Sequence, residues 1–332
     1  MHASRAGQVM VRLRDGRVLV AGGETAGDFY CRSSVEIYDP SRNAWTKAAR
    51  LAHRECGARA LVLGDGRVLV AGGYLTKARG TSGPTATVEV YDPTTDRWSV
   101  APSMHDPRAY ATIAALPNGD VLLAGGGTRS AERYNPRTGR WWMTGPMSIR
   151  RSFFGSTEAA TLPDGDVLVA GGSRYRAERY VVAQHRWRPA GHLRTKGDPY
   201  LFPLPNGHVL AIGAGHTAKV DEYLPAKNDW RPFVALPQQR EAVQVVAVRG
   251  RPLVLGGFGR TDPRGSIPAH ATGWLWSPTR DRWLVLTTMP APKADFGAVR
   301  LRDGTILVAG GQTLLEQGAH VPTRSAFRYD LR

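Results

Sequence analysis

Basic side chains recur at one position of a repeated sequence, and these are the residues best suited to binding chemistry. Most of them lie 17 residues before a glycine pair, as Arg108 does before Gly125-Gly126. A guanidinium can bind a carboxylate or a phosphate through two parallel hydrogen bonds, so the pattern predicts a set of anion-binding side chains. The predicted ligand-binding residues are Arg5, Arg54, Arg108, Arg150, Arg151, Lys196, Arg240 and Lys293.

A structural interpretation of the same cations is open as well, because an acid recurs two positions before an aromatic residue in most repeats. These acids are Glu36, Glu89, Glu132, Glu178 and Asp221. Each cation could pair with the acid of its own repeat and serve only as scaffold. Trp274 and Phe327 replace the acid in the last two repeats. Arg240 and Lys293 are therefore the cations least neutralised by a neighbour.

Groups capable of acid–base or nucleophilic chemistry fall in the same connecting segments. The catalytic candidates are Glu158, Asp198, Tyr200, Glu241, Asp295, His53 and Cys56, with His216, His270 and His320 in the wider inventory. No motif fixes their placement, so the inventory defines no mechanism. Cys31 and Cys56 are predicted to be a buried pair of free thiols; a disulfide, a metal site with His53 and a cysteine nucleophile are the alternatives.

The recurring glycine pair marks the repeats along the whole chain. It occurs at Gly22-Gly23, Gly72-Gly73, Gly125-Gly126, Gly171-Gly172, Gly213-Ala214, Gly256-Gly257 and Gly310-Gly311. The successive spacings are 50, 53, 46, 42, 43 and 54 residues. A period in this range indicates stacked supersecondary units.

Each repeat divides into four short segments, here named strands A to D. Asp-Gly or Asn-Gly turns such as Asp65-Gly66 connect A to B, and β-branched runs without a helical period fill the strands. An aromatic residue of strand C precedes the tryptophan of strand D by seven residues, as Tyr91 precedes Trp98. This fixed offset predicts that both rings pack in the core between sheets.

Four-stranded sheets repeated radially form a β-propeller. We predict one all-β domain over residues 1–332, a seven-bladed propeller with six full four-stranded blades and an incomplete seventh. The predicted blades span residues 1–50, 51–103, 104–147, 148–192, 193–236, 237–289 and 290–332. No tryptophan strand follows Tyr329, so the seventh blade is expected to have three strands; the alternative is that the natural N-terminus is longer.

The order of Gly-Gly, Tyr-Asp-Pro and a tryptophan seven residues after the tyrosine resembles the kelch repeat, the type found in the central domain of galactose oxidase. The resemblance covers nearly the whole chain. It implies a kelch-type propeller but not an activity, because one scaffold carries many functions. Arginine is common at the cationic position of kelch proteins, and in some of them it binds acidic peptides.

Strand direction alternates, so the B–C loops and the D–A connections share one end of every blade, here called the loop end. The B–C loops are long at residues 24–33, 74–86, 258–271 and 312–323. We expect them to form a crescent over half of this face. Because function tends to lie on variable loops of a rigid scaffold, the loop end is the predicted site.

The resemblance also implies chemistries that this sequence does not match. Copper-radical oxidases of the kelch type need a Tyr-His pair and a cysteine cross-linked to tyrosine, and no Tyr-His dipeptide occurs here. Kelch-type specifier proteins bind iron through Glu-x3-Asp-x3-His, but Arg32 follows Glu24 and Asp28 where histidine is needed. Kelch-type sialic-acid epimerases use Arg, Glu and His on an anionic sugar; these residue types are present here, but no motif fixes their placement. We therefore predict no cofactor and no metal site.

Composition and charge limit the classes of partner that we expect. The formal net charge is +16, but the basic residues are spread through every repeat, so we do not expect nucleic acid as a partner. No apolar run is long enough for a membrane helix, and the first residues lack the apolar core of a signal peptide, so we expect a cytoplasmic protein with no membrane partner. We also expect a monomer. The predicted function is recognition of an anionic small molecule or acidic peptide. The alternative is a metal-independent isomerase, cyclase or lyase.

Overall fold

The computed structural model describes residues 1–25, 30–76, 82–151, 158–171, 175–194, 197–213, 217–259, 267–286, 288–314 and 320–331. These residues form antiparallel sheets, and a single 3-10 turn, Val182–Gln184, is their only helical element. The chain separates into two compact units. Unit 1 contains Met1–Cys56, His216–Ala218 and Val234–Arg332, and unit 2 contains Gly57–Gly215 and Lys219–Phe233.

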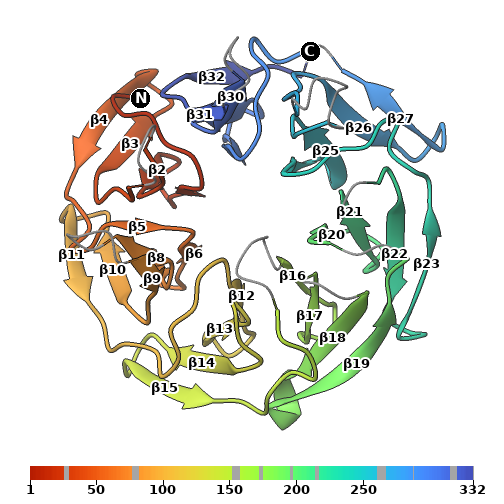
Figure 1. The fold of residues 1–332 in the computed structure, drawn as a ribbon, viewed down its shortest axis with the longest axis horizontal. Helices are drawn as coiled ribbons and strands as arrows, with labels where there is room; N and C mark the ends of the chain where they lie inside the picture. Colours follow the sequence, from red (N-terminus) through yellow and green to blue (C-terminus); the bar gives the residue numbers. More distant parts are fainter. Residues whose placement is uncertain are drawn as a thin grey trace. The chain divides into compact units, whose positions relative to one another are not determined.

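Unit 1 holds blades 1, 6 and 7 (Figure 1). Blade 1 consists of β1 (Val9–Arg12), β2 (Val18–Ala21), β3 (Val35–Asp39) and β4 (Ala44–Ala48). Blade 6 consists of β24 (Gln244–Val248), β25 (Arg251–Leu255), β26 (Gly273–Ser277) and β27 (Arg282–Val285). Blade 7 consists of β28 (Gly297–Arg300), β29 (Ile306–Ala309) and β32 (Ala326–Tyr329). The short strand β5 (Glu55–Cys56) ends the first stretch of this unit.

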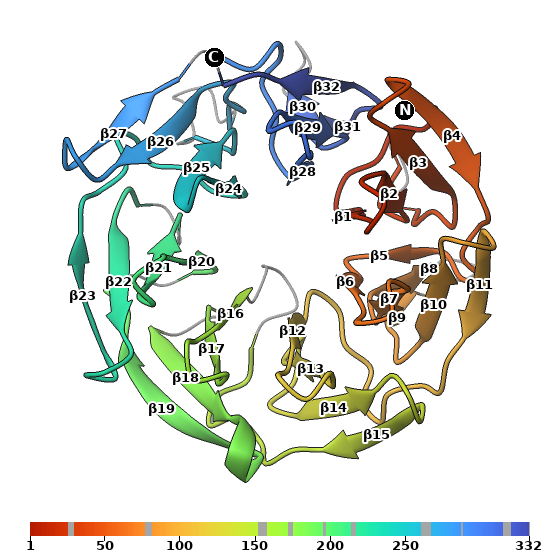
Figure 2. The ribbon, with the colours of Figure 1, turned by 180° about the vertical axis from the view of Figure 1, so that it is seen from behind.

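Unit 2 holds blades 2 to 5, seen from behind in Figure 2. Blade 2 consists of β6 (Arg59–Val62), β7 (Val68–Ala71), β10 (Val88–Asp92) and β11 (Arg97–Val100). Blade 3 consists of β12 (Thr112–Ala115), β13 (Val121–Ala124), β14 (Ala131–Asn135) and β15 (Arg140–Met143). Blade 4 consists of β16 (Glu158–Thr161), β17 (Val167–Ala170), β18 (Arg176–Val181) and β19 (Arg186–His192). Blade 5 consists of β20 (Tyr200–Pro203), β21 (Val209–Ile212), β22 (Val220–Leu224) and β23 (Asp229–Phe233).

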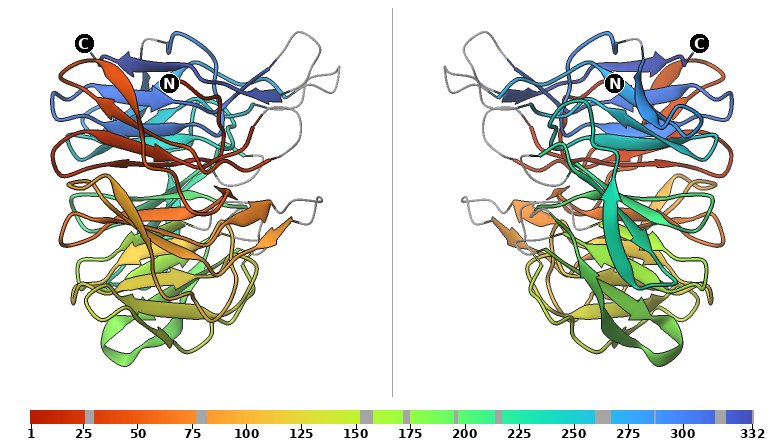
Figure 3. Two further views of the ribbon diagram at one scale, coloured as in Figure 1. Left: turned by 90° about the vertical axis from the view of Figure 1, so that its left-hand side faces the viewer. Right: turned by 90° about the vertical axis from the view of Figure 1, so that its right-hand side faces the viewer.

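Long B–C loops add hairpins to two blades. The strands β8 (Tyr74–Thr76) and β9 (Ser82–Pro84) pair in unit 2, and β30 (Gln312–Leu314) pairs with β31 (His320–Pro322) in unit 1. The dark-blue hairpin β30–β31 projects beyond the sheet strands of unit 1 in both views of Figure 3. Two of the four long loops are thus partly built from paired strands. Residues 26–29, 77–81, 260–266 and 315–319 of the four loops lie outside the described part.

The core lies between neighbouring sheets. Six of the seven B strands are buried along their full length, because each is the second strand of its sheet and carries apolar side chains on both faces. In β25 only the first residue, Arg251, is partly exposed. Val20 and Leu307 belong to one cluster that joins blades 1 and 7, and Leu69 and Val121 belong to another that joins blades 2 and 3. Apolar burial of this kind contributes roughly 25 cal/mol per Å² of surface removed from water.

The aromatic pairs predicted from the seven-residue offset lie opposite each other on strands C and D, with their ring planes tilted. Tyr91 is directly opposite Trp98, with ring centroids 5.0 Å apart, and Tyr134 and Trp141 are 4.6 Å apart. The Trp141 indole N–H donates to the Pro102 carbonyl of the preceding blade at 2.7 Å. This tryptophan therefore fastens the D strand of blade 3 both to its own sheet and to the preceding blade.

The kelch-type propeller fold is confirmed, with six four-stranded sheets and a three-stranded seventh in the described part of the chain. Blade 6 uses the tightest A–B connection, in which Val248 pairs with Arg251 across Arg249 and Gly250, both with positive φ. Among the described residues, no helix has the length and apolar content that crossing a membrane would require.

Candidate functional site

The glycine pair lets two blades meet closely at the loop end. In blade 1, Gly22 and Gly23 have φ values of 66° and 89°. A Cβ atom would lie 2.5 Å from the Glu55 carbonyl oxygen at Gly22 and 2.8 Å from the Ala6 carbonyl oxygen at Gly23. A side chain at either position would therefore push neighbouring backbone away. The pair is scaffold that places the cations described next.

Arg5 caps the loop end of blade 1 and is fully buried. Its Nη1 donates to the carbonyl oxygens of Gly22 and Ser34, each at 2.9 Å. Its Nη2 donates to Ser34 Oγ at 3.1 Å and to Glu36 Oε1 at 2.9 Å. The guanidinium thus joins strands B and C of its own blade through an ion pair and two main-chain contacts.

Blade 3 repeats this arrangement almost atom for atom. Arg108 donates to the carbonyl oxygens of Gly125 and Ser130, each at 3.1 Å, to Ser130 Oγ at 3.2 Å and to Glu132 Oε1 at 2.6 Å. In blade 4, Arg151 contacts Glu178 Oε2 at 2.9 Å. Arg108 and Arg151 have no exposed surface. In these blades the geometry favours the structural interpretation of the cation over direct ligand contact.

The acids of these pairs are held ionised by more than the arginine. Glu36 accepts the backbone N–H groups of His2 at 2.6 Å and Ala3 at 3.1 Å. Burial alone would raise the pKa of Glu36, but the His2 N–H and the Arg5 guanidinium outweigh it, and the net pKa is lowered. Glu132 is held in the same way, and its pKa is also lowered.

Two predicted ligand-binding cations lie outside this arrangement, and a third falls outside the described residues. Arg54 is exposed, and the buried Glu55 takes the aligned position in blade 2. Arg150 is exposed as well and donates through Nε to the Gly127 carbonyl at 2.5 Å, leaving the capping position of blade 4 to Arg151. Lys196 is not among the described residues; in its blade Asp221 accepts Arg194 instead.

Arg240 and Lys293, in unit 1, are the exceptions among the buried cations. Each is 1% exposed, and no carboxylate of the described chain lies within ion-pair distance of either. Arg240 donates to the Gly256 carbonyl at 3.1 Å and to Thr272 Oγ1 at 2.7 Å. Lys293 donates to the Gly310 carbonyl at 2.8 Å and to a serine hydroxyl at 2.5 Å.

Aromatic rings replace the missing acids. Arg240 lies 4.5 Å from the ring centroid of Trp274, and Lys293 lies 5.8 Å from that of Phe327. A ring quadrupole stabilises a cation far less than a buried carboxylate does. Burial therefore lowers the pKa of Arg240 to about 10 and that of Lys293 to about 8. Two buried positive charges at the loop end of blades 6 and 7 are thus only partly compensated.

The predicted catalytic residues are divided between the two units. Glu241, Asp295 and His270 accompany Arg240 and Lys293 in unit 1, whereas Asp198 and Tyr200 belong to unit 2. His270 is half-buried, and burial, followed by the Arg240 charge, lowers the pKa of its imidazole. His216 and Asp28 fall outside the described residues, and the side chains of Glu158 and His320 are not described. The geometry assembles no catalytic set from these groups.

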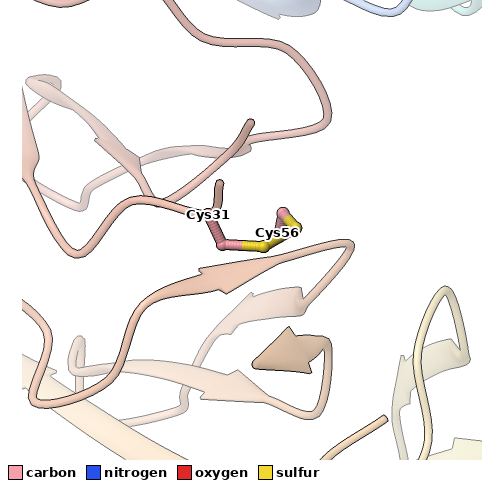
Figure 4. The surroundings of a disulfide bond; sticks show 2 residues. All are labelled: Cys31 and Cys56. Atoms are coloured by element: carbon pink, nitrogen blue, oxygen red, sulfur yellow. A yellow bond between two sulfur atoms is a disulfide. The ribbon is translucent and has the colours of Figure 1, made fainter. Parts of the chain in front are cut away.

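The predicted free thiols are wrong, because Cys31 and Cys56 form a disulfide (Figure 4). Glu55 donates its N–H to the Arg32 carbonyl at 3.1 Å, and this backbone bridge brings the two cysteine Cα atoms to 5.1 Å. Both cysteines are buried. Cys56 therefore has no thiolate to act as a nucleophile, and the bond fastens the first B–C loop to the chain entering blade 2.

Sequence reasoning missed the hydroxyl groups that complete the caps of blades 1, 3, 6 and 7. Ser34, Ser130, Thr272 and Ser325 lie two residues before the acid or its aromatic replacement, and each accepts a hydrogen bond from the cation of its blade. The recurrence of Ser or Thr at this place in the aligned repeats was the signal that could have found them.

Comparison with known proteins agrees with this construction. Residues 56–105 match the family model of the Kelch motif. The chain is 30% identical to Beta-scruin of Limulus polyphemus over 122 residues, which is 36% of this chain and 13% of that protein. It is 33% identical to an F-box/kelch-repeat protein of Arabidopsis thaliana over 104 residues, 31% of this chain and 20% of that protein. The matches thus span a small part of these longer relatives.

A solved structure extends the likeness to nearly the whole chain. A fungal alcohol oxidase of the AA5 family, in complex with copper, superposes with a TM-score of 0.77 at 19% identity, covering 98% of this chain and 74% of that one. This likeness concerns the fold. The donor set here does not suit a copper-radical centre, because both cysteine sulfur atoms of the chain are joined in the Cys31–Cys56 disulfide and neither can be cross-linked to a tyrosine.

Proposed function

Because the chain is a kelch-repeat β-propeller, we propose that it is a recognition scaffold that binds an anionic ligand at the loop end of blades 6 and 7. The ligand class is a small carboxylate-bearing molecule or an acidic peptide. One observation carries the proposal: Arg240 and Lys293 are buried cations that lack the acidic partner present in blades 1, 3 and 4.

The physical reason is the free-energy cost of burying a charge without a counter-charge. Such a group either changes its protonation state or is stabilised by an opposite charge that comes from elsewhere. The pKa values of Arg240 and Lys293 are lowered because burial disfavours their charged forms. A bound carboxylate would offset this cost by supplying the negative charge that the blade lacks.

Access distinguishes this site from an open cationic patch. Both side chains are 1% exposed, so the anion is expected to bind over the residues that cover them. Its electrostatic attraction to the two buried charges would then be screened only weakly by salt. Direct contact would need the covering loop residues to move. In either case affinity should depend on these two charges more than on the bulk charge of +16.

The test is calorimetric titration of the full chain with citrate and with a ten-residue Asp/Glu peptide. The double variant Arg240→Ala/Lys293→Ala should weaken binding at least tenfold, whereas Lys293→Arg, which keeps the charge, should retain it. Arg17→Ala, which removes a half-exposed charge at an A–B turn paired with Asp15, is the matched control for bulk charge. Equal affinities for the double variant and the control would refute the proposal.

The alternative is a metal-independent isomerase, cyclase or lyase acting at the same place. The pKa of about 8 for Lys293 favours it, because a fraction of the amine is neutral near physiological pH. Recognition is preferred because the described candidates Glu241, His270 and Asp295 surround no defined reacting position. Turnover of a carboxylate-bearing substrate that is abolished by Lys293→Gln would reverse this preference.

A further inference from the structure

The connections between strands A and B of blades 1 and 7 carry the same basic sequence. Both read Arg-Leu-Arg-Asp-Gly, at residues 12–16 and 300–304. Residues 12–17 and 300–305 together contain five arginines and two aspartates, which is a net charge of +3. They lie at the end of each blade opposite the loop end, here called the turn end. Positive charge is therefore concentrated at the turn end of these two blades.

The other blades show that this charge is not a requirement of the turn. The aligned residues 115–120 of blade 3 and 161–166 of blade 4 have net charges of −1 and −2. In blades 2 to 5 the first arginine position holds Val62, Ala115, Thr161 and Pro203, and the second holds Gly64, Pro117, Pro163 and Pro205. A structural role common to all A–B turns therefore does not explain the arginines of blades 1 and 7.

Contacts between the two blades bring these arginines together. Strands β1 and β28 are neighbours within unit 1. Arg12 Nη1 donates to the Arg300 carbonyl oxygen at 2.6 Å, and Arg302 Nη2 donates to the carbonyl oxygen of Arg14. Each hydrogen bond runs from one blade to the other, in opposite directions. The four residues, here called the arginine cluster, thus belong to one surface; Arg300 is partly buried and the other three are exposed.

Arg302 takes the place that a proline fills elsewhere. A Cβ atom at Gly165, in the turn of blade 4, would lie 2.6 Å from Cγ of Pro117 in blade 3, so this proline packs on the turn of the next blade. Between blades 7 and 1, a Cβ atom at Gly16 would lie 3.1 Å from Cδ and Nε of Arg302. Arg302 therefore makes the same contact between blades and adds a positive charge, which proline would not.

The acids of the two turns have other partners. Asp15 pairs with Arg17 Nε at 2.7 Å, and Asp303 pairs with Arg328. Both aspartates also accept the backbone N–H two residues later, at 2.9 Å. Among the residues that the structure describes, no carboxylate lies within ion-pair distance of Arg12, Arg300 or Arg302. The charge of these three side chains is thus open to an external anion.

We propose that the arginine cluster binds a small ligand with two or more linked phosphate groups at the turn end of blades 1 and 7. A guanidinium donates two parallel hydrogen bonds to phosphate oxygens. Linked phosphates carry several negative charges on a short chain, so one ligand can contact cations from both blades. The site is distinct from the loop end, where Arg240 and Lys293 are buried, and it is independent of the anion proposed there.

The test is calorimetric titration of the full chain with inorganic tripolyphosphate. We expect saturable binding that weakens as salt is added, because salt screens exposed charges. Inorganic orthophosphate, which has one phosphate group, should bind at least tenfold more weakly. Equal affinities for the two anions would overturn the assignment of linked phosphates.

The decisive variant is Arg12→Ala/Arg302→Pro, which gives both positions the residues that blade 3 has there. Blade 3 forms the same hydrogen-bonded turn with these residues, so the variant should fold, and it should weaken tripolyphosphate binding at least tenfold. Arg280→Gln/Arg282→Gln is the matched control, because it also removes two exposed charges from the turn end of unit 1. The control should bind as the wild type does. Equal losses in the two variants, or no loss in the first, would overturn the proposal.

A further titration separates this site from the loop-end site. The variant Arg240→Ala/Lys293→Ala should bind tripolyphosphate as tightly as the wild type, whether or not it has lost citrate binding. Loss of tripolyphosphate binding in this variant, with binding retained by Arg12→Ala/Arg302→Pro, would assign the phosphates to the loop end and contradict a site at the arginine cluster.

Discussion

Replacing Arg108 by methionine separates the structural role of the repeated cation from a ligand-binding role. The substitution keeps much of the side-chain volume but removes four hydrogen bonds and leaves Glu132 buried without its counter-ion. Both members of the pair are 0% exposed. Breaking a buried pair by removing one partner costs about 3–5 kcal/mol, so we expect Arg108→Met to destabilise blade 3 by roughly that amount.

Arg240→Met provides the comparison within the same chain. It removes hydrogen bonds to Gly256 and Thr272 and the contact with Trp274, but it leaves no buried carboxylate behind. We therefore expect a smaller loss, about 1–3 kcal/mol from the hydrogen bonds, partly offset because an uncompensated buried charge is removed.

The assay is urea unfolding followed by tryptophan fluorescence, with local hydrogen exchange to assign the change to one blade because unfolding in several steps is expected for two compact units. A double-mutant cycle with Glu132→Gln should return a coupling of at least about 1 kcal/mol between Arg108 and Glu132. A loss below about 1 kcal/mol for Arg108→Met, or no coupling, would refute the structural account.

Three further predictions follow from the caps and the disulfide. Folding lowers the pKa values of Glu36 and Glu132. Their contribution to stability is therefore present above the unfolded carboxyl pKa and should be lost as the pH falls through the lower folded value. In acid unfolding, Glu132→Gln should make stability depend less on pH in this range. The pKa of Lys293 is lowered to about 8, so the unfolded state binds more protons between about pH 8 and 10.5, and stability to urea should rise with pH across that window in the wild type but not in Lys293→Gln. Opening the 25-residue loop closed by Cys31 and Cys56, by Cys→Ser at both positions, should destabilise the chain by about 3–4 kcal/mol from loop entropy; an unchanged melting temperature under oxidising conditions would contradict a structural disulfide.

Repetition made the fold predictable from the sequence. The spacing of the glycine pair and the offset from Tyr91 to Trp98 fix strand order and ring packing, because each unit samples the same local geometry. The Arg5–Glu36 type of pair was predictable for the same reason, since both residues hold fixed places in the repeat.

Departures from the repeat were harder to predict. The Cys31–Cys56 bond depends on the backbone bridge from Arg32 to Glu55, which no residue type in the sequence signals. In blade 4 the capping Arg151 lies 20 residues before Gly171, instead of the usual 17. The sequence pattern therefore does not choose Arg151 over its neighbour Arg150. Lys293 is only 1% exposed because of packing between blades. This burial could not be predicted from the sequence, where a lysine in a connecting segment is expected to be exposed.

The most direct test of the anion-binding proposal is the titration of Lys293 by NMR, observed at its ε-carbon with and without saturating citrate. The proposal predicts that bound citrate raises the pKa of Lys293 from about 8 by about one unit or more, because an opposite charge nearby favours the ammonium form. An identical titration curve in the presence of citrate, with binding verified by calorimetry, would contradict an anion site formed by Arg240 and Lys293.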